Sequence, residues 1–104
     1  DGVIGITPIK FMLSDAPRGA SMEDFIAHLE HVIALVGSDH VAVSSDLKRN
    51  GVEESEVVAY TSPKLNSEER WFHLYDALKK RGYSEEDLRK IFGLNFLRVF
   101  RAVL

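Results

Sequence analysis

The sequence predicts an α/β fold made of one βαβ unit followed by three C-terminal helices, and three observations support this. Two short apolar runs, at residues 2–6 and 40–46, have the composition of buried strands. The segment between them carries apolar residues at helical spacing, which predicts a helix that connects two parallel strands. After a polar loop over residues 48–66, three more helical stripes occupy residues 67–104. We therefore expect one structural unit over the whole chain, with the βαβ part at residues 1–47.

The two strands lack alternation of polar and apolar residues, which is typical of strands buried on both faces. The first reads Gly-Val-Ile-Gly-Ile and stops at Thr7 and Pro8; the second contains Val-Ala-Val and ends in Ser-Ser-Asp. Two such strands do not make a stable parallel sheet, because each needs further strands beside it and helices on both sides. The missing neighbours must come from a larger α/β protein or from other copies that pair through open strand edges.

Helix boundaries are indicated by capping residues. Four residues have the N-cap type and position: Ser21, Asn66, Ser84 and Asn95. The first three are followed at the capping-box position by an acidic side chain: Asp24, Glu69 and Asp87. The same three helices are expected to end at a glycine: Gly37, Gly82 and Gly93. Residues 14–20 are predicted to form a loop, and residues 11–13 fit no single element.

Composition excludes several classes of protein. The 104 residues are 45% hydrophobic and 28% charged with a net charge of −3, which is ordinary for a globular domain and argues against a nucleic-acid-binding module. The chain has no cysteine, so disulfides, cysteine zinc sites and a cysteine nucleophile are excluded. That absence and the lack of a signal peptide favour a cytoplasmic location. No apolar run approaches the ~18 residues of a membrane span. Because the first residue is Asp1, we expect a processed product or part of a longer chain.

Asp46 is the strongest candidate for a catalytic residue. It follows a buried strand directly, where a carboxylate is costly unless it is paired or useful. The alternative is an ordinary turn or cap residue, and position alone leaves both interpretations open. Lys48 and Arg49, in the loop that follows, are candidates for binding an anionic group of a substrate, although a solvated loop is the simpler explanation.

Histidines and serines offer weaker candidates. His28 and His31 lie three residues apart on the first helix and could bind a metal, but no third ligand follows at a recognisable spacing. We therefore predict packing or surface roles for this pair and no metal site in the chain. Ser44 and Ser45 lack both a placed histidine base and a Gly-x-Ser-x-Gly motif, which argues against a nucleophile.

Five segments taken together resemble the membrane (renal) dipeptidase family, peptidase family M19, whose members are zinc-dependent dipeptidases of the amidohydrolase type. The segments cover residues 2–6, 21–31, 35–46, 78–88 and 91–100. Their order and spacing are similar to the C-terminal part of the family, so the resemblance covers nearly all of this chain but only the last part of a typical member.

The resemblance implies that the chain is the C-terminal portion of a (β/α)8 TIM-type barrel and supplies its last two strands. It also implies two zinc ions in the parent protein, held by ligands on earlier strands that are not in this chain. Asp46 matches the aspartate of a Gly-Ser-Asp-type motif after the final strand, which implies proton handling or binding of the substrate ammonium by charge. The family often continues Phe-Asp-Gly where this chain has Leu-Lys-Arg, so Lys48 and Arg49 imply an altered or lost substrate preference.

The sequence thus predicts a C-terminal fragment of a zinc-dependent dipeptidase that acts on dipeptides or small amides in the parent protein and is inactive alone. One carboxylate cannot replace a metal centre that activates water. The fragment should self-associate or need the rest of the barrel. The alternative is a non-catalytic α/β module that self-associates through its strand edges.

Overall fold

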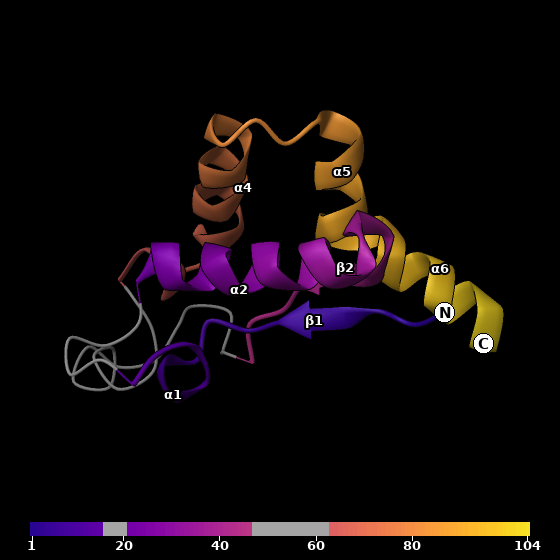
Figure 1. The fold of residues 1–104 in the computed structure, drawn as a ribbon, viewed down its shortest axis with the longest axis horizontal. Coiled ribbons are helices and arrows are strands. Elements are labelled where there is room, and N and C mark those ends of the chain that lie inside the picture. The colour runs from indigo at the N-terminus through magenta and orange to yellow at the C-terminus, as the bar shows by residue number, and fades with distance from the viewer. Residues whose placement is uncertain (16–20, 47–62) are drawn as a thin grey trace.

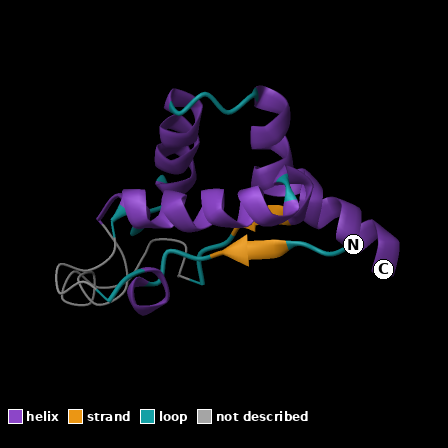
Figure 2. Cartoon of the chain, viewed as in Figure 1, coloured by secondary structure: helices purple, strands orange, loops and turns teal. Residues whose placement is uncertain are grey.

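The structure is a computed structural model that describes residues 1–15, 21–46 and 63–104 (Figure 1). Its N-terminal half contains β1 (Ile4–Ile6), α1 (Lys10–Leu13), α2 (Met22–Val36), the 3₁₀ turn η1 (Ser38–His40) and β2 (Val41–Val43). Its C-terminal half contains the 3₁₀ turn η2 (Pro63–Leu65), α4 (Arg70–Lys80), α5 (Glu85–Arg89), the π-helical segment η3 (Lys90–Leu94) and α6 (Asn95–Val103). The predicted mixed α/β arrangement of one strand pair and several helices is confirmed (Figure 2). Most of the predicted 48–66 loop, residues 48–62, lies outside the described residues.

β1 and β2 are connected through α2 and pair in parallel, as the βαβ pattern predicts. Ile4 lies opposite Val41, and Ile6 lies opposite Val43. β2 is buried along its whole length, but half of Ile4 in β1 is exposed (50%). The expectation that both strands are buried on both faces is therefore wrong for β1. The reason is that, among the described residues, β2 is the sole strand beside it.

α2 begins and ends where the sequence predicts. The Ser21 hydroxyl accepts from the Asp24 N–H (3.2 Å), and the Asp24 carboxylate accepts from the Ser21 N–H (2.8 Å), which completes a capping box. Gly37 ends the helix with φ 85°, a conformation that costs glycine little. The helix buries Phe25, Ile26 and Leu29. These three side chains belong to the hydrophobic core that joins α2 to β2, α4, α5 and η3.

Removal of the α2 cap should lower stability measurably. We expect Ser21→Ala to reduce the free energy of unfolding by about 1 kcal/mol, because the Asp24 N–H loses its acceptor. Thermal unfolding followed by circular dichroism measures the change. Ser21→Thr keeps a capping hydroxyl and should retain most of the stability. Ser67→Ala is the control, since its hydroxyl accepts one long contact from Glu69 (3.3 Å) outside any helix. Equal losses in the alanine and threonine variants of Ser21 would contradict the cap as the cause.

α4 starts later than the sequence predicts. The pattern places Asn66 at its N-cap, but the helix begins at Arg70, with Glu69 at the N-cap position and no side-chain cap bond. The chain makes a turn first: the Ser67 carbonyl accepts from the Arg70 N–H (3.2 Å). The predicted end is confirmed, since Gly82 follows α4 with φ 95°.

The last two helices are continuous, which differs from the predicted stop at Gly93 and cap at Asn95. Ser84 caps α5 as expected and accepts from the Asp87 N–H (3.1 Å). The chain then bends at Gly93 within η3 and continues directly into α6. Asn95 is buried inside this run, with 1% of its surface exposed. Its backbone is helical, with φ −65° and ψ −43°, so it lies inside the helical run and is not an N-cap, which would have non-helical backbone angles.

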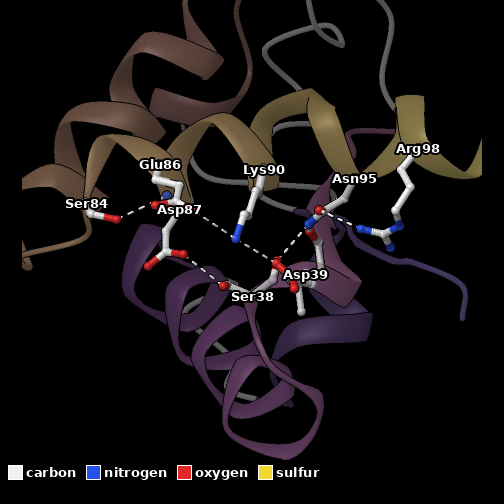
Figure 3. Close-up of polar contacts among 9 residues, drawn as sticks. Ser38, Asp39, Ser84, Glu86, Asp87, Lys90, Asn95 and Arg98 are labelled. Atoms are coloured by element: carbon white, nitrogen blue, oxygen red, sulfur yellow. Dashed lines mark hydrogen bonds and ion pairs between the residues drawn. The ribbon is translucent and has the colours of Figure 1, made fainter.

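The amide of Asn95 instead joins α6 to the start of β2. It donates to the carbonyl oxygens of Ser38 (2.7 Å) and Val41 (2.8 Å). Figure 3 shows Asn95 with the other polar side chains of this region. Nearby, the Ser38 hydroxyl donates to the Asp87 carboxylate (2.9 Å). Lys90 forms an ion pair with Asp39 (2.8 Å), and this contact lowers the pKa of the Asp39 carboxyl. The turn before β2 is therefore tied to α5, η3 and α6 by side-chain bonds.

No helix in the described part of the chain is both long enough and apolar enough to cross a membrane.

Candidate functional site

The carboxyl ends of the two strands meet at one edge of the sheet because the strands are parallel. Two side-chain hydrogen bonds join the strand ends at this edge. The Thr7 hydroxyl donates to the Ser45 carbonyl (2.9 Å), and the Ser44 hydroxyl donates to the Ile6 carbonyl (3.3 Å). In parallel α/β folds, ligands bind just past these strand ends. The edge formed by residues 7–9 and 44–46 is therefore the candidate site.

Asp46 lies at this edge in an unusual backbone conformation. Its φ is 52°, and it is the sole non-glycine residue in the described ranges with a positive φ. Aspartate tolerates the left-handed region better than most residues, but such backbone outliers still cluster at functional sites. The side chain is exposed, directly past Ser45. The structure thus places the predicted catalytic carboxylate in solvent where the two strands end, and its chemical role stays a prediction.

α1 lies next to the same end of β1. Its last residue, Leu13, is buried (8% exposed), and the Leu13 carbonyl accepts from His28 Nε2 of α2 (2.9 Å). The His28 side chain is exposed, and this bond links α2 to the end of α1; the roles predicted for the pair with His31 stay predictions. Residues 11–13, which fit no single element in the sequence, form most of this helix.

Two further polar side chains near the strands form hydrogen bonds with backbone carbonyl groups. Ser44 donates its hydroxyl to the Ile6 carbonyl. His40 lies at the amino end of β2, where Nδ1 donates to the Gly2 carbonyl (2.9 Å). Lys48 and Arg49, the predicted substrate-binding residues, lie outside the described residues.

Sequence reasoning misses two buried polar residues. It assigns Asn95 to a cap and does not single out Arg70, yet Arg70 is 3% exposed and its Nε donates to the Leu65 carbonyl (2.9 Å). Burial lowers the pKa of this guanidinium. For Asn95 a signal exists: an asparagine inside an otherwise apolar helical stripe points to a buried amide with backbone partners. Arg70 carries no such signal, because an arginine at the start of a helix is normally solvated.

Comparison with known proteins decides the family. A family model described as membrane dipeptidase, peptidase family M19, matches residues 1–104. The chain belongs to this family. The resemblance inferred from the five sequence segments is thereby confirmed.

Three of the curated relatives are named as dipeptidases. Dipeptidase tcpJ of Claviceps purpurea is 31% identical over 102 residues, which cover 98% of this chain and 22% of the relative. Dipeptidase verJ of Clonostachys rogersoniana is also 31% identical, over 98% of this chain and 24% of the relative. Dipeptidase ataJ of Aspergillus terreus is 35% identical over 78 residues, or 75% of this chain and 17% of the relative. This chain therefore spans less than a quarter of the length of these relatives.

The described residues do not fit a zinc site. Within residues 1–15, 21–46 and 63–104, no group of three histidine, cysteine, aspartate or glutamate side chains converges to hold a metal ion. A catalytic zinc normally takes three protein ligands. A zinc ion in this protein would therefore need ligands beyond the described residues.

Proposed function

We propose that this chain is the C-terminal part of a dipeptidase that hydrolyses short peptide or amide bonds. The observation that carries the proposal is Asp46, a carboxylate in a left-handed backbone conformation at the joined carboxyl ends of two parallel strands. Membership of the M19 family and the fungal dipeptidase relatives supply the reaction class.

The proposed setting is a (β/α)8 barrel whose last two strands are β1 and β2. A parallel pair with a connecting helix is the repeating unit of such barrels. In these barrels the active site lies at the carboxyl ends of the strands, which is where Thr7, Ser45 and Asp46 lie in this chain. With these two strands alone, the Ile4 side chain of β1 is half exposed, and further strands would cover it.

The proposed role of Asp46 is to hold the free ammonium group of a dipeptide by charge. An exposed carboxylate needs no rearrangement to accept hydrogen bonds from an ammonium group, and charge-assisted hydrogen bonds are about twice as strong as neutral ones. Lys48 and Arg49 follow two and three residues later, so we propose that they lie near the same substrate and bind an anionic part of it. The zinc ions expected for the family would take their ligands from outside residues 1–104.

A second candidate function is a non-catalytic α/β module that self-associates. It is favoured by the exposed apolar side chains on β1 and α6, such as Ile4 and Phe100, each 50% exposed. Contiguous exposed apolar surface commonly marks an interface. This candidate predicts one defined oligomer of the 104-residue chain.

The test compares the product of the gene's complete reading frame with residues 1–104 alone. Both are purified and assayed against a panel of dipeptides, with and without a metal chelator. We expect chelator-sensitive hydrolysis by the complete product and none by residues 1–104. Zinc-dependent hydrolysis by residues 1–104 alone would overturn the proposed division of the site. No dipeptide hydrolysis by the complete product, together with one defined oligomer of the short chain, would favour the module.

A further inference from the structure

The hydrogen bond between Thr7 and Ser45 acts on the peptide group directly before Asp46. The Ser45 carbonyl, which accepts from the Thr7 hydroxyl (2.9 Å), belongs to the planar peptide unit that ends at the Asp46 nitrogen. Rotation of this unit changes ψ of Ser45 and φ of Asp46 together. A hydrogen bond to its carbonyl oxygen therefore opposes the rotation that would take Asp46 away from its φ of 52°.

The left-handed backbone of Asp46 needs a restraint of this kind. Steric contacts disfavour this region for every residue except glycine, although aspartate and asparagine adopt it more readily than most. Residues in sparsely populated conformations persist where the surrounding structure holds them there. The Asp46 side chain is exposed, so its own burial does not hold the backbone. The bond to the Ser45 carbonyl supplies a restraint from the residue before it.

Thr7 is carried by a segment with little freedom of its own. Its side chain branches at Cβ, which limits χ1, and the following Pro8 restricts the Thr7 backbone to extended conformations. Thr7 is half-buried, and Pro8 and Ile9 are buried, so the chain is anchored in the protein directly after it. The hydroxyl that holds the Ser45 carbonyl therefore has a nearly fixed position.

The two strand exits are joined at two successive places. The Ile6 carbonyl accepts from the Ser44 N–H (2.9 Å) and from the Ser44 hydroxyl (3.3 Å), which continues the pairing of β1 and β2 past Val43. The bond from Thr7 follows one residue later on both strands. This second bond is the one that reaches the peptide group of Asp46, so it transmits the fixed geometry of the strand pair to that residue.

We propose that Thr7 is a positioning residue, whose hydroxyl holds Asp46 in the left-handed conformation that directs its carboxylate at the substrate ammonium. The inference rests on the proposed function of Asp46 and adds the residue that sets the direction of its carboxylate. Thr7 needs no contact with the substrate, because it acts through the peptide group between Ser45 and Asp46. A hydroxyl at the end of one strand thereby orients a charge at the end of the other.

Kinetics of the product of the complete reading frame test this role. Thr7→Val keeps the branched shape but removes the hydroxyl, and it should lower kcat/KM for dipeptides about two- to tenfold, the factor that one neutral hydrogen bond contributes. Thr7→Ser keeps the donor and should retain most of the activity. Equal losses in the valine and serine variants would overturn the proposal.

Ser38→Ala is the matched control for Thr7→Val. It also removes a half-buried hydroxyl that forms a 2.9 Å bond to a distant segment, but it lies at the amino end of β2, away from the candidate site. It should therefore leave kcat/KM unchanged. A loss of kcat/KM in Ser38→Ala as large as that in Thr7→Val would overturn the proposal, because the loss would then follow from any missing bond of this kind.

A double-mutant cycle separates action through Asp46 from a general structural effect. In the Asp46→Asn background the charge that Thr7 orients is absent, so Thr7→Val should change kcat/KM by less than about twofold. Thr7→Val alone should weaken inhibition by an amine-bearing dipeptide analogue and leave inhibition by its N-acetylated counterpart unchanged. A fully additive loss in the double variant would overturn the proposal, because Thr7 would then act independently of Asp46.

A structural readout keeps this inference separate from the proposed function. Crystal structures of the complete product and of its Thr7→Val variant should show a positive φ at Asp46 in the first and a rotated peptide group before Asp46 in the second. An unchanged φ in the variant would overturn the positioning role, even where dipeptides are hydrolysed. A product that hydrolyses no dipeptide, with the peptide group rotated in the variant, would defeat the proposed function and leave the restraint of Asp46 by Thr7 standing.

Discussion

Replacement of Asn95 by alanine is expected to destabilise the chain by about 2–4 kcal/mol, because a buried acceptor left without its donor costs about 1–3 kcal/mol. The amide donates to the Ser38 and Val41 carbonyl oxygens at 2.7 and 2.8 Å, and the side chain is 1% exposed. Alanine removes both donors and leaves a gap that the core must fill. Chemical denaturation followed by circular dichroism measures the loss, and the midpoint of thermal unfolding should fall by about 10 °C or more.

The control for Asn95 lies in the same junction. Ser38→Ala removes one hydroxyl that donates to Asp87 (2.9 Å) at a partly exposed position, so it should cost clearly less, about 1 kcal/mol. Asn95→Asp is the sharper variant, since it places a carboxylate against two carbonyl oxygens and should destabilise at least as much as alanine. A loss for Asn95→Ala no larger than that for Ser38→Ala would contradict the assignment of the two buried bonds.

Asn95 also shows where sequence reasoning stops. Local signals locate α2 correctly, because the capping box of Ser21 and Asp24 and the positive φ at Gly37 depend on residues close in sequence. A cap at Asn95 is wrong because its partners, Ser38 and Val41, lie more than fifty residues earlier in the chain. The predicted start of α4 fails for a related reason: Asn66 has the cap type, but the chain completes a turn through Ser67 before the helix begins.

For the site, the sequence locates the edge but not its geometry. The pattern predicts two parallel strands and places Asp46 directly after the second of them. It does not show the left-handed backbone of Asp46 or the bond between Thr7 and Ser45, because both depend on how the strand exits are joined. The exposure of β1 agrees with the strand count, since two apolar strands need neighbours from outside the chain to be buried on both faces.

If the proposed function holds, replacement of Asp46 by asparagine in the product of the complete reading frame should lower kcat/KM for dipeptides about ten- to hundredfold, because a hydrogen bond to a charged group contributes about 1.5–3 kcal/mol. Asparagine keeps the size of the side chain and tolerates the left-handed backbone at φ 52°, so the fold and the strand exits should be preserved. What is lost is the charge that we propose to hold the substrate ammonium. Steady-state kinetics on a free dipeptide measures the effect, and an unchanged thermal midpoint verifies the fold. Asp76→Asn, an exposed carboxylate on α4, is the matched control and should leave kcat/KM unchanged.

Inhibitors with and without a charged amino group distinguish the two roles considered for Asp46. If the carboxylate holds the ammonium by charge, Asp46→Asn should weaken competitive inhibition by an amine-bearing dipeptide analogue and leave inhibition by its N-acetylated counterpart nearly unchanged, since the acetylated nitrogen carries no charge. If Asp46 instead transfers a proton during hydrolysis, kcat should fall by about a hundredfold or more while both inhibitors bind as before. Equal weakening of both inhibitors would contradict the ammonium contact, because the charge that distinguishes the two ligands would then not be what Asp46 recognises.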